Sequence, residues 1–489
     1  MKLLFHGHDY RYAVEQSLLA FFPNERPVYE GEDDPNTATV TLTQTGTLCT
    51  AVTMLSVDSK QASGESALDI SGAKDSYERE RLLQRIVKLS FFQAARALTG
   101  VTPAWGALTG IRPAKLAASI MEESNSAEET DRILRDTYFV SEPRRRLAIE
   151  CAKVGRDAQR DLAPNDISLY LGIPFCPTRC AYCSFVSNSV EKSFHLVEPY
   201  LEALFREIDS AATLVRDLGL NIKSFYMGGG TPTTLTADQM RRLLERLNTK
   251  FDLSRVVEYT VEAGRPDTIT MDKLLALKEG GVSRVSINPQ SMEDAVLTAI
   301  GRRHSSDDIR AAMEQVNAVG FPHVNMDLIA GLPEDTPEGF RRTLDEVIAF
   351  GTDNITIHTL SLKKGSRITL EGTRIPSVEE VGAMLDYADP ALRRADFAPY
   401  YLYRQKYMSG SFENVGWCKH GGTGWYNIYI MEELHTILSL GAGGSTKLVD
   451  TANNRIERVF NLKYPKEYID RAEKIQENQA AIRLFYETK

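Results

Sequence analysis

Three cysteines lie close together in the sequence, directly after an apolar segment. Cys176, Cys180 and Cys183 have the spacing C-x3-C-x2-C, and residues 168–173 before them have the apolar character of a buried strand. Thiolates grouped in one loop at the end of a strand suit an iron–sulfur cluster better than a disulfide. Because Phe185 occupies the position where a fourth cysteine is expected, one iron would be open to a ligand from outside the protein.

A zinc site is the alternative interpretation of these cysteines. Zinc in a structural site takes four ligands, and His195 is the nearest candidate for the fourth. His195 falls at the start of the next predicted helix, which is a poor position for a ligand. The three remaining cysteines are isolated in the sequence, and we expect ordinary core or surface thiols at Cys49, Cys151 and Cys418.

Composition restricts the classes of partner and compartment. A net charge of -9 and a pI near 5.6 argue against a nucleic-acid partner, since phosphate binding needs a basic surface. The sequence has no signal-peptide pattern and no apolar run long enough to span a membrane. We therefore expect a cytoplasmic monomer with no membrane span.

The 489 residues are enough for two or three domains, and the order of the predicted elements divides them into three parts. Residues 1–162 predict an α+β and helical extension. Residues 163–375 predict six strand–helix units, hence an α/β fold with a parallel sheet closed into a partial (β/α)6 barrel. Residues 376–489 predict a mainly helical C-terminal region that covers the substrate.

Individual elements are predicted from hydrophobic periodicity. In the barrel, strands are expected at 168–173, 224–227, 256–261, 284–288, 323–329 and 354–358, and helices at 197–218, 237–248, 271–278, 306–319 and 338–350. In the first part we expect a strand at 2–5, a hairpin at 37–43 and 47–55, and helices at 12–22, 75–98, 114–122, 127–139 and 142–162. The last part predicts helices at 378–394 and 466–485.

A glycine-rich segment, residues 227–233, follows the second predicted barrel strand. Gly229 and Gly230 allow the backbone to approach a ligand closely and expose N–H donors, and Thr231 adds a hydroxyl. The segment therefore suits an amino-acid carboxylate or amino group. A glycine run alone is often only a turn, but its position one unit after the cysteines favours a binding role.

Charged residues lie at the ends of other predicted strands, where barrel proteins bind ligands. Glu262 ends the third strand and suits an amino group, the alternative being a surface charge. Asp327 lies within an apolar strand, which is costly for an unpartnered carboxylate, so a ligand such as a ribose diol is favoured. Arg302 follows the fourth strand and suits a carboxylate.

A loop before the barrel, residues 105–115, has the composition of a second candidate site. Its glycines, its proline, Arg112 and Lys115 are compatible with anion binding. A connector that caps the neighbouring helices explains the same residues equally well.

Taken in order, these motifs resemble the oxygen-independent coproporphyrinogen III oxidase family of radical S-adenosylmethionine (SAM) enzymes. The similarity covers about residues 168–361, and the HemZ branch, longer at its N-terminus, matches best. The family motifs are LY-x2-IPFC-x3-C-x-YC, GGGTPT, VEAGRP, NPQS, GRRH and MDLIAGLP; the branch is indicated by residues 108–113, 358–364, 401–406, 426–433 and 441–444.

The resemblance implies a 4Fe–4S cluster bound by Cys176, Cys180 and Cys183, with SAM on the fourth iron. It implies catalytic roles for Tyr170, Glu262 and Arg302. The positions that match SAM contacts are Tyr170, Gly229, Gly230, Thr231, Glu262, Gln290, Arg302, Asp327 and Ile329.

The implied activity is anaerobic oxidative decarboxylation of coproporphyrinogen III to protoporphyrinogen IX in haem biosynthesis, that is, a coproporphyrinogen dehydrogenase. The implied partners are a tetrapyrrole substrate and an electron donor such as flavodoxin or ferredoxin. Two departures from the founding oxidase affect the active site: Gly172 replaces a histidine, and Phe185 replaces a further cysteine. A haem-binding chaperone of the same family, or a different radical SAM reaction on a porphyrin such as methyl transfer or ring opening, is therefore kept as an alternative.

A tetra-acid substrate needs cations around an apolar surface. Several cations and aromatic residues after the barrel provide both, although a solvated surface is the simpler reading for any one of them. The candidates are Arg112, Lys363, Lys364, Arg404, Lys406, Lys419, Tyr400, Tyr401, Tyr403 and Trp417.

Overall fold

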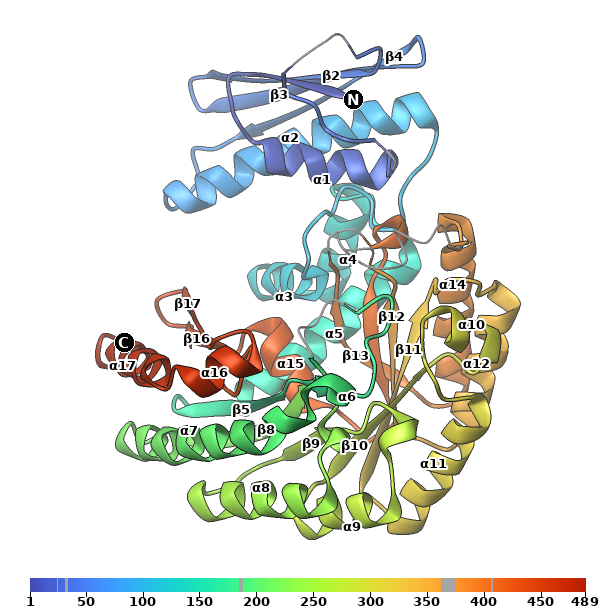
Figure 1. Ribbon diagram of the computed structural model, residues 1–489. Helices are drawn as coiled ribbons and strands as arrows, with labels where there is room; N and C mark the ends of the chain where they lie inside the picture. Colours follow the sequence, from blue (N-terminus) through green and yellow to red (C-terminus); the bar gives the residue numbers. More distant parts are fainter. Residues whose placement is uncertain (24, 31–33, 184–187, 362–373, 406–407) are drawn as a thin grey trace. The chain divides into compact units, whose positions relative to one another are not determined.

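The chain forms two compact units (Figure 1). The computed structural model describes residues 1–23, 25–30, 34–183, 188–361, 374–405 and 408–489. Unit 1 contains Met1–Ile149 and Arg404–Phe412, and unit 2 contains Glu150–Tyr403 and Glu413–Lys489. This division into two units differs from the three parts expected from the sequence, whose domain boundaries stay a prediction.

Unit 1 is built on a four-stranded sheet of order β1-β2-β3-β4. Its strands are β1 (Lys2–His6), β2 (Thr37–Thr45), β3 (Leu48–Val57) and β4 (Lys60–Asp69). Two helices, α1 (Arg11–Phe21) and α2 (Ser76–Thr99), pack their apolar residues, among them Leu18 and Phe91, against this sheet. Strand β4 was not predicted because its serines, glycine and charged residues have no strand-like apolar pattern.

The remaining helices of unit 1 match the predicted ones. They are α3 (Pro113–Ser124), α4 (Ala127–Asp136) and the first part of α5 (Glu142–Arg160), which crosses the boundary between the units. Helix α2 begins where the Asp75 side chain accepts a hydrogen bond from the Glu78 N–H, and ends at Gly100, whose φ of 71° is left-handed.

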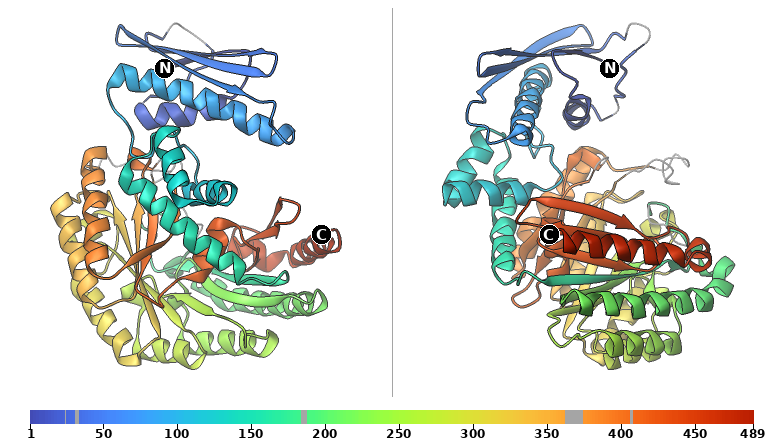
Figure 2. Two further views of the ribbon diagram at one scale, coloured as in Figure 1. Left: turned by 180° about the vertical axis from the view of Figure 1, so that it is seen from behind. Right: turned by 90° about the vertical axis from the view of Figure 1, so that its left-hand side faces the viewer.

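Unit 2 contains an eleven-stranded sheet whose centre is the predicted parallel barrel. Six neighbouring parallel strands confirm the six predicted ones. They are β5 (Asp166–Ile173), β8 (Asn221–Gly229), β9 (Glu258–Glu262), β10 (Arg284–Gln290), β11 (His323–Ala330) and β12 (Asn354–Thr359). Figure 2 shows helices on the outer face of this curved sheet. They include α7 (Val197–Asp217), α8 (Ala237–Lys250), α9 (Met271–Glu279), α11 (Ser306–Val319) and α12 (Pro337–Ala349).

The C-terminal region extends both edges of the barrel sheet, a feature the sequence did not predict. Strands β14 (Asn414–Cys418) and β13 (Ala398–Tyr403) continue beyond β12, whereas β15 (Thr436–Leu440), β16 (Ser445–Asp450) and β17 (Arg455–Phe460) continue beyond β5. These strands are short, and three of them are almost wholly buried, so they lack the alternation that identifies a strand. The predicted helices correspond to α14 (Val378–Arg394) and to α16 (Pro465–Asp470) with α17 (Glu473–Glu487); α15 (Trp425–Glu432) lies between them.

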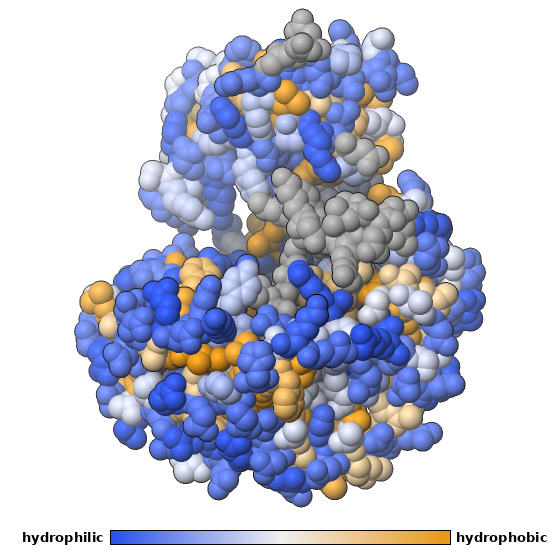
Figure 3. Space-filling model, viewed as in Figure 1, coloured by the Kyte–Doolittle hydropathy of each residue, from blue (hydrophilic) through white to orange (hydrophobic). Residues whose placement is uncertain are grey.

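Short elements complete unit 2: β6 (Phe175–Cys176) pairs with β7 (Asn188–Ser189), and α6 (Val190–Ser193), η1 (Phe194–Leu196) and α10 (Asp294–Ala299) connect the barrel units. No described helix is long and apolar enough to cross a membrane. The face shown in Figure 3 is mostly hydrophilic, with apolar residues in small patches.

A buried carboxylate connects the C-terminal region to the barrel. Glu207 of α7 is 3% exposed and accepts hydrogen bonds from the Gly441 N–H at 2.7 Å, the Asn461 amide at 2.8 Å and the Tyr468 hydroxyl. Burial nevertheless raises the pKa of this carboxyl group. Three donors from separate segments of the C-terminal region thus depend on one side chain.

We predict that Glu207→Ala lowers the free energy of unfolding by about 3 kcal/mol, because three buried donors lose their acceptor. Urea denaturation followed by circular dichroism measures the change. Glu202→Ala, on an exposed position of the same helix, is the control and is expected to change it by less than about 1 kcal/mol. Equal effects of the two substitutions would contradict the structural role of Glu207.

Candidate functional site

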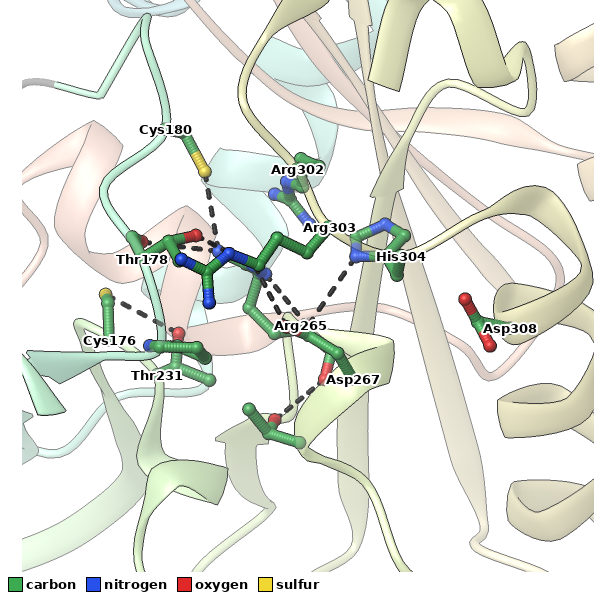
Figure 4. Close-up of polar contacts among 12 residues, drawn as sticks. Cys176, Thr178, Cys180, Thr231, Arg265, Asp267, Arg302, Arg303, His304 and Asp308 are labelled. Carbon is green, nitrogen blue, oxygen red and sulfur yellow. Dashed lines mark hydrogen bonds and ion pairs between the residues drawn. The ribbon is translucent and has the colours of Figure 1, made fainter. Parts of the chain in front are cut away.

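The cysteine loop begins at the carboxyl end of β5. Cys176 lies in β6, and Cys180 and Cys183 lie in the segment that follows; all three are partly exposed and none is in a disulfide. Figure 4 shows Cys176 and Cys180. Within the described residues, no group of three or more His, Cys, Asp or Glu side chains is arranged so that it could hold a metal ion. His195, the candidate for a fourth zinc ligand, lies in the short helix η1 (Phe194–Leu196).

Donors from the segments that follow β8 and β9 contact two of the three sulfur atoms of this loop. Arg265, 3% exposed, directs one guanidinium nitrogen to the Thr178 carbonyl at 3.3 Å and to Cys180 Sγ at 3.7 Å, and the other to Thr178 Oγ1 at 3.2 Å. The Thr231 hydroxyl lies 3.6 Å from Cys176 Sγ. Such donors stabilise negative charge on sulfur.

Arg265 is itself fixed by an acidic partner. Its guanidinium makes an ion pair with Asp267 at 3.1 Å, and Asp267 lies 3.6 Å from Nδ1 of the buried His304 (Figure 4). Although burial alone would raise it, the pKa of Asp267 is lowered to about 2, because His304 and Arg265 favour the carboxylate. Desolvation lowers the pKa of His304.

The glycine segment after β8 passes very close to β5. The N–H of Gly230 donates to the Ile173 carbonyl at 2.8 Å, and that of Thr231 to the Phe175 carbonyl at 2.7 Å. A Cβ atom on Gly230 would lie 2.4 Å from the Phe175 carbonyl oxygen, which no side chain tolerates. Gly229 has a φ of 100°, so this position also requires glycine.

Glu262, at the end of β9, faces the inside of the barrel. It accepts hydrogen bonds from the Tyr226 hydroxyl of β8 and from Asn288 Nδ2 of β10 at 2.6 Å. Burial, followed by repulsion from Asp327, raises the pKa of Glu262 to about 7. This carboxyl group would therefore gain from a cationic ligand.

Asp327 of β11 lies on the same inner surface. It accepts from Asn325 Nδ2 at 2.8 Å and lies 3.6 Å from His358 Nε2 of β12. His358 in turn lies 3.5 Å from the Tyr403 hydroxyl of β13. Ile329 lies two residues after Asp327 in the strand, so its buried side chain points to the same side of the sheet.

Arg302 connects the cysteine loop to β10. Its guanidinium donates to the Gly264 carbonyl at 3.1 Å, the Asn288 carbonyl at 2.8 Å and the Tyr182 hydroxyl at 2.9 Å. Its Nε atom is buried without a partner among the described residues, as is Oε1 of Gln290, whose φ of 71° ends β10. These two atoms are available to a ligand.

Three tyrosine rings form one wall of the barrel interior. Tyr226 stacks on Tyr426 of α15 at a centroid distance of 4.6 Å, and Tyr170 of β5 lies 6.4 Å from both. All the predicted cofactor and catalytic residues therefore lie on β5, β8, β9, β10 and β11 or on the segments that follow them. Six residues contribute to the site although they were not predicted as site residues: Tyr182, Tyr226, Arg265, Asn288, His358 and Tyr426. Arg265 could have been predicted, because it lies shortly after the end of the barrel strand β9.

The substrate-contact candidates are placed less favourably. Arg404 belongs to unit 1, where its guanidinium donates to the carbonyls of Leu108 and Ser411. Lys419 follows Cys418, which pairs with Asn354 at the amino end of β12, the opposite end from the site. The buried Tyr400 and Trp417 are at that end too, whereas Tyr401 and Tyr403 continue toward the carboxyl end. Arg112 lies in unit 1; Phe185, Lys363, Lys364 and Lys406 lie outside the described residues.

Comparison with known proteins agrees with this geometry. Residues 170–347 match the family model of the radical SAM superfamily. The chain is 37% identical to the oxygen-independent coproporphyrinogen-III oxidase-like protein HemZ of Bacillus subtilis, over 82% of this chain and 81% of HemZ. It is 27% identical to the heme chaperone HemW of Escherichia coli, over 62% of this chain and 75% of HemW.

A solved structure shows the same fold. Coproporphyrinogen III oxidase (HemN) from Escherichia coli superimposes with a TM-score of 0.53 at 23% identity, covering 66% of this chain and 72% of HemN. Together with the identity to HemZ across most of both chains, the parallel barrel with its cysteine loop leads to one conclusion. This chain belongs to the radical SAM superfamily, in the family of oxygen-independent coproporphyrinogen III oxidases and their HemZ relatives.

Proposed function

We propose that Cys176, Cys180 and Cys183 hold a 4Fe–4S cluster. Three partly exposed thiols in one loop, none of them in a disulfide, are the donors such a cluster needs, and the family to which the chain belongs implies it. Arg265 and Thr231 support this assignment because they bring hydrogen-bond donors to two of the three sulfur atoms. Hydrogen bonds to cluster sulfur are one of the means by which a protein adjusts reduction potential.

SAM is proposed to bind beside the cluster, across the carboxyl ends of the strands. Its amino group is assigned to Glu262, which accepts hydrogen bonds from the neutral donors Tyr226 and Asn288, and its ribose to Asp327. The unpartnered Arg302 Nε and Gln290 Oε1 supply further contacts, with the backbone of Gly229, Gly230 and Thr231, the ring of Tyr170 and the side chain of Ile329. When bound, the cluster and SAM supply one-electron chemistry that removes a hydrogen atom from a substrate C–H bond.

The proposed reaction is the oxidative decarboxylation of coproporphyrinogen III to protoporphyrinogen IX. The observation that carries it is the 37% identity to the coproporphyrinogen-III oxidase-like HemZ over 82% of this chain, well beyond the barrel. Each of two propionates gives up one hydrogen atom, one electron and carbon dioxide, leaving a vinyl group. The electron passes to an acceptor outside the chain, and a flavodoxin or ferredoxin supplies the reducing electron.

The chain's own residues would orient the substrate and limit the access of water. The stacked rings of Tyr170, Tyr226 and Tyr426 offer an apolar surface beside the proposed SAM site. His358 and Tyr403 provide polar contacts on the other side of the interior. The protein's contribution is thus placement of the C–H bond.

A haem-binding chaperone is the second candidate function. It is favoured by the identity to heme chaperones named HemW and by the surroundings of Gly172, where the founding oxidase has a histidine. A Cβ atom on Gly172 would lie 3.2 Å from the Ala442 carbonyl oxygen, so the neighbouring backbone leaves little room for a larger side chain. Position 172 therefore offers no side chain to the substrate in this chain.

The two functions are separated by anaerobic incubation of cluster-loaded protein with SAM, a strong reductant and coproporphyrinogen III. We expect methionine formation that depends on substrate and a product lacking two carboxyl groups, both detected by mass spectrometry. Cys180→Ala is expected to lower both by at least a hundredfold, since the cluster loses a ligand. SAM cleavage without tetrapyrrole change, together with tight haem binding, would instead support the chaperone.

We predict that Arg265→Met accelerates the loss of iron from the reconstituted protein to a chelator by about tenfold or more, because groups that support metal ligands typically contribute that much to affinity. Iron release followed by absorbance measures the effect. Arg310→Met, which removes an exposed arginine of α11, serves as the control. A release rate equal to that of the parent would contradict the role of Arg265, and Arg265→Lys should restore part of the retention.

SAM affinity should depend on pH through Glu262. With a pKa of about 7, this group loses its negative charge as the pH falls below neutrality. Between pH 7.5 and 5.5 we expect the dissociation constant for SAM to rise roughly tenfold or more, as measured by anaerobic calorimetry. Glu262→Gln should bind more weakly at pH 7.5 and show little pH dependence; a parent-like pH profile in this variant would exclude Glu262 as the titrating group.

A further inference from the structure

Unit 1 contains a cavity of about 530 Å³ that the proposed reaction does not use. It is bounded by α2, by the loop 107–112 and by α3 and α4. The loop is part of the segment whose sequence suggested either anion binding or a capping connector. The volume is in the range of sites that hold small organic ligands.

One wall of the cavity is strongly cationic. Arg81, Arg85 and Lys88 line it from α2, and their spacing of four and three residues places them along one face of the helix. Arg112 adds a fourth cation, and Glu123 is the one acidic residue among those that line the cavity. Glu78 already makes an ion pair with Arg81 at 3.6 Å, so a bound anion would chiefly compensate Arg85 and Lys88.

Two polar atoms among the described lining residues are buried without a hydrogen-bond partner. Within the described part of the chain, Arg85 Nε and Thr109 Oγ1 are buried and make no hydrogen bond. Desolvation lowers the pKa of Lys88, which is the sign of an ammonium group without a nearby acid. Unsatisfied buried donors are costly, typically 1–3 kcal/mol each, so a ligand that accepts hydrogen bonds from them is favoured.

The rest of the lining is largely apolar. Leu89 and Ala107 continue the hydrophobic cluster that α2 forms with Phe92 and Phe139. The other apolar residues that line the cavity are Leu82, Leu108, Leu116, Ile120 and Ile133. A simple inorganic anion would leave this apolar lining without contacts, and an uncharged apolar molecule would leave the cations unpaired.

We propose that this cavity binds an organic carboxylate with an apolar body. The carboxylate takes hydrogen bonds from Arg85, Lys88 and Thr109, and the apolar part packs on the leucine and isoleucine wall. The site requires neither the cluster nor SAM, so the proposal stands apart from the function assigned to the barrel.

Binding is tested on the full chain with 8-anilinonaphthalene-1-sulfonate, an amphipathic anion whose fluorescence rises in apolar sites. We expect one site per chain, from which sodium decanoate displaces the reporter, whereas inorganic phosphate and decanol at the same concentration do not. Displacement by phosphate would show a site for inorganic anions, and displacement by decanol a merely apolar cavity; either result overturns the proposal.

Variants assign the binding to the cationic wall. Lys88→Met and Arg85→Met should each weaken decanoate binding roughly tenfold or more, the effect of losing a hydrogen bond to a charged group. Lys74→Met, at an exposed position before α2, is the matched control and should bind as the parent does. Because Lys88→Met removes a desolvated charge, the ligand-free variant should unfold at a temperature no lower than the parent. Unchanged decanoate affinity in both variants would refute the site.

Discussion

The geometry of the barrel mouth depends on the close approach of three backbone segments around the carboxyl end of β5. On one side Gly230 hydrogen-bonds to Ile173, at a separation that excludes any side chain. On the other side a Cβ atom on Gly441 would lie 2.5 Å from the Gly172 carbonyl oxygen. The cysteine loop leaves β5 between these contacts, so its path is determined by β8 and β15 together. Residues as far apart in the sequence as Gly172 and Gly441 thereby fix one loop.

Electrostatics explains why this interior suits a charged cofactor. Glu262 and Asp327 face one desolvated space, and each depends on neutral donors and on His358 more than on a strong cation. Arg302 and Arg265, by contrast, lie toward the cysteine loop, where their guanidinium groups contact carbonyls, a tyrosine hydroxyl and sulfur. Negative charge is thus compensated at the loop and left uncompensated deeper in the barrel. A ligand that is cationic at one end fits this distribution.

Much of this arrangement could be predicted from the sequence, and for a definite reason. The six barrel strands and the helices between them alternate regularly, and chemistry-bearing residues such as Glu262 and Arg302 follow strand ends in a recurrent order. The strands β13 to β17 could not be predicted, because short buried strands carry no alternation and their pairing partners are far away in sequence. The same limit applies to Tyr426 of α15, whose relation to Tyr170 and Tyr226 depends on which sheet edge the C-terminal region joins. Lys419 was a candidate for substrate contact because of its charge. It follows Cys418, which pairs with Asn354 at the amino end of β12, and the site lies at the carboxyl end.

Unit 1 is discontinuous, and this has a consequence for synthesis of the protein on the ribosome. The chain leaves unit 2 after β13, contributes residues 404–412 to unit 1 and returns in β14. Arg404 supplies the N–H donor for the Ile111 carbonyl and guanidinium contacts to the carbonyl of Leu108. These carbonyl groups lack their partner until the barrel strands have been translated. The N-terminal unit therefore completes its native hydrogen bonds only late in synthesis, after most of the barrel has emerged.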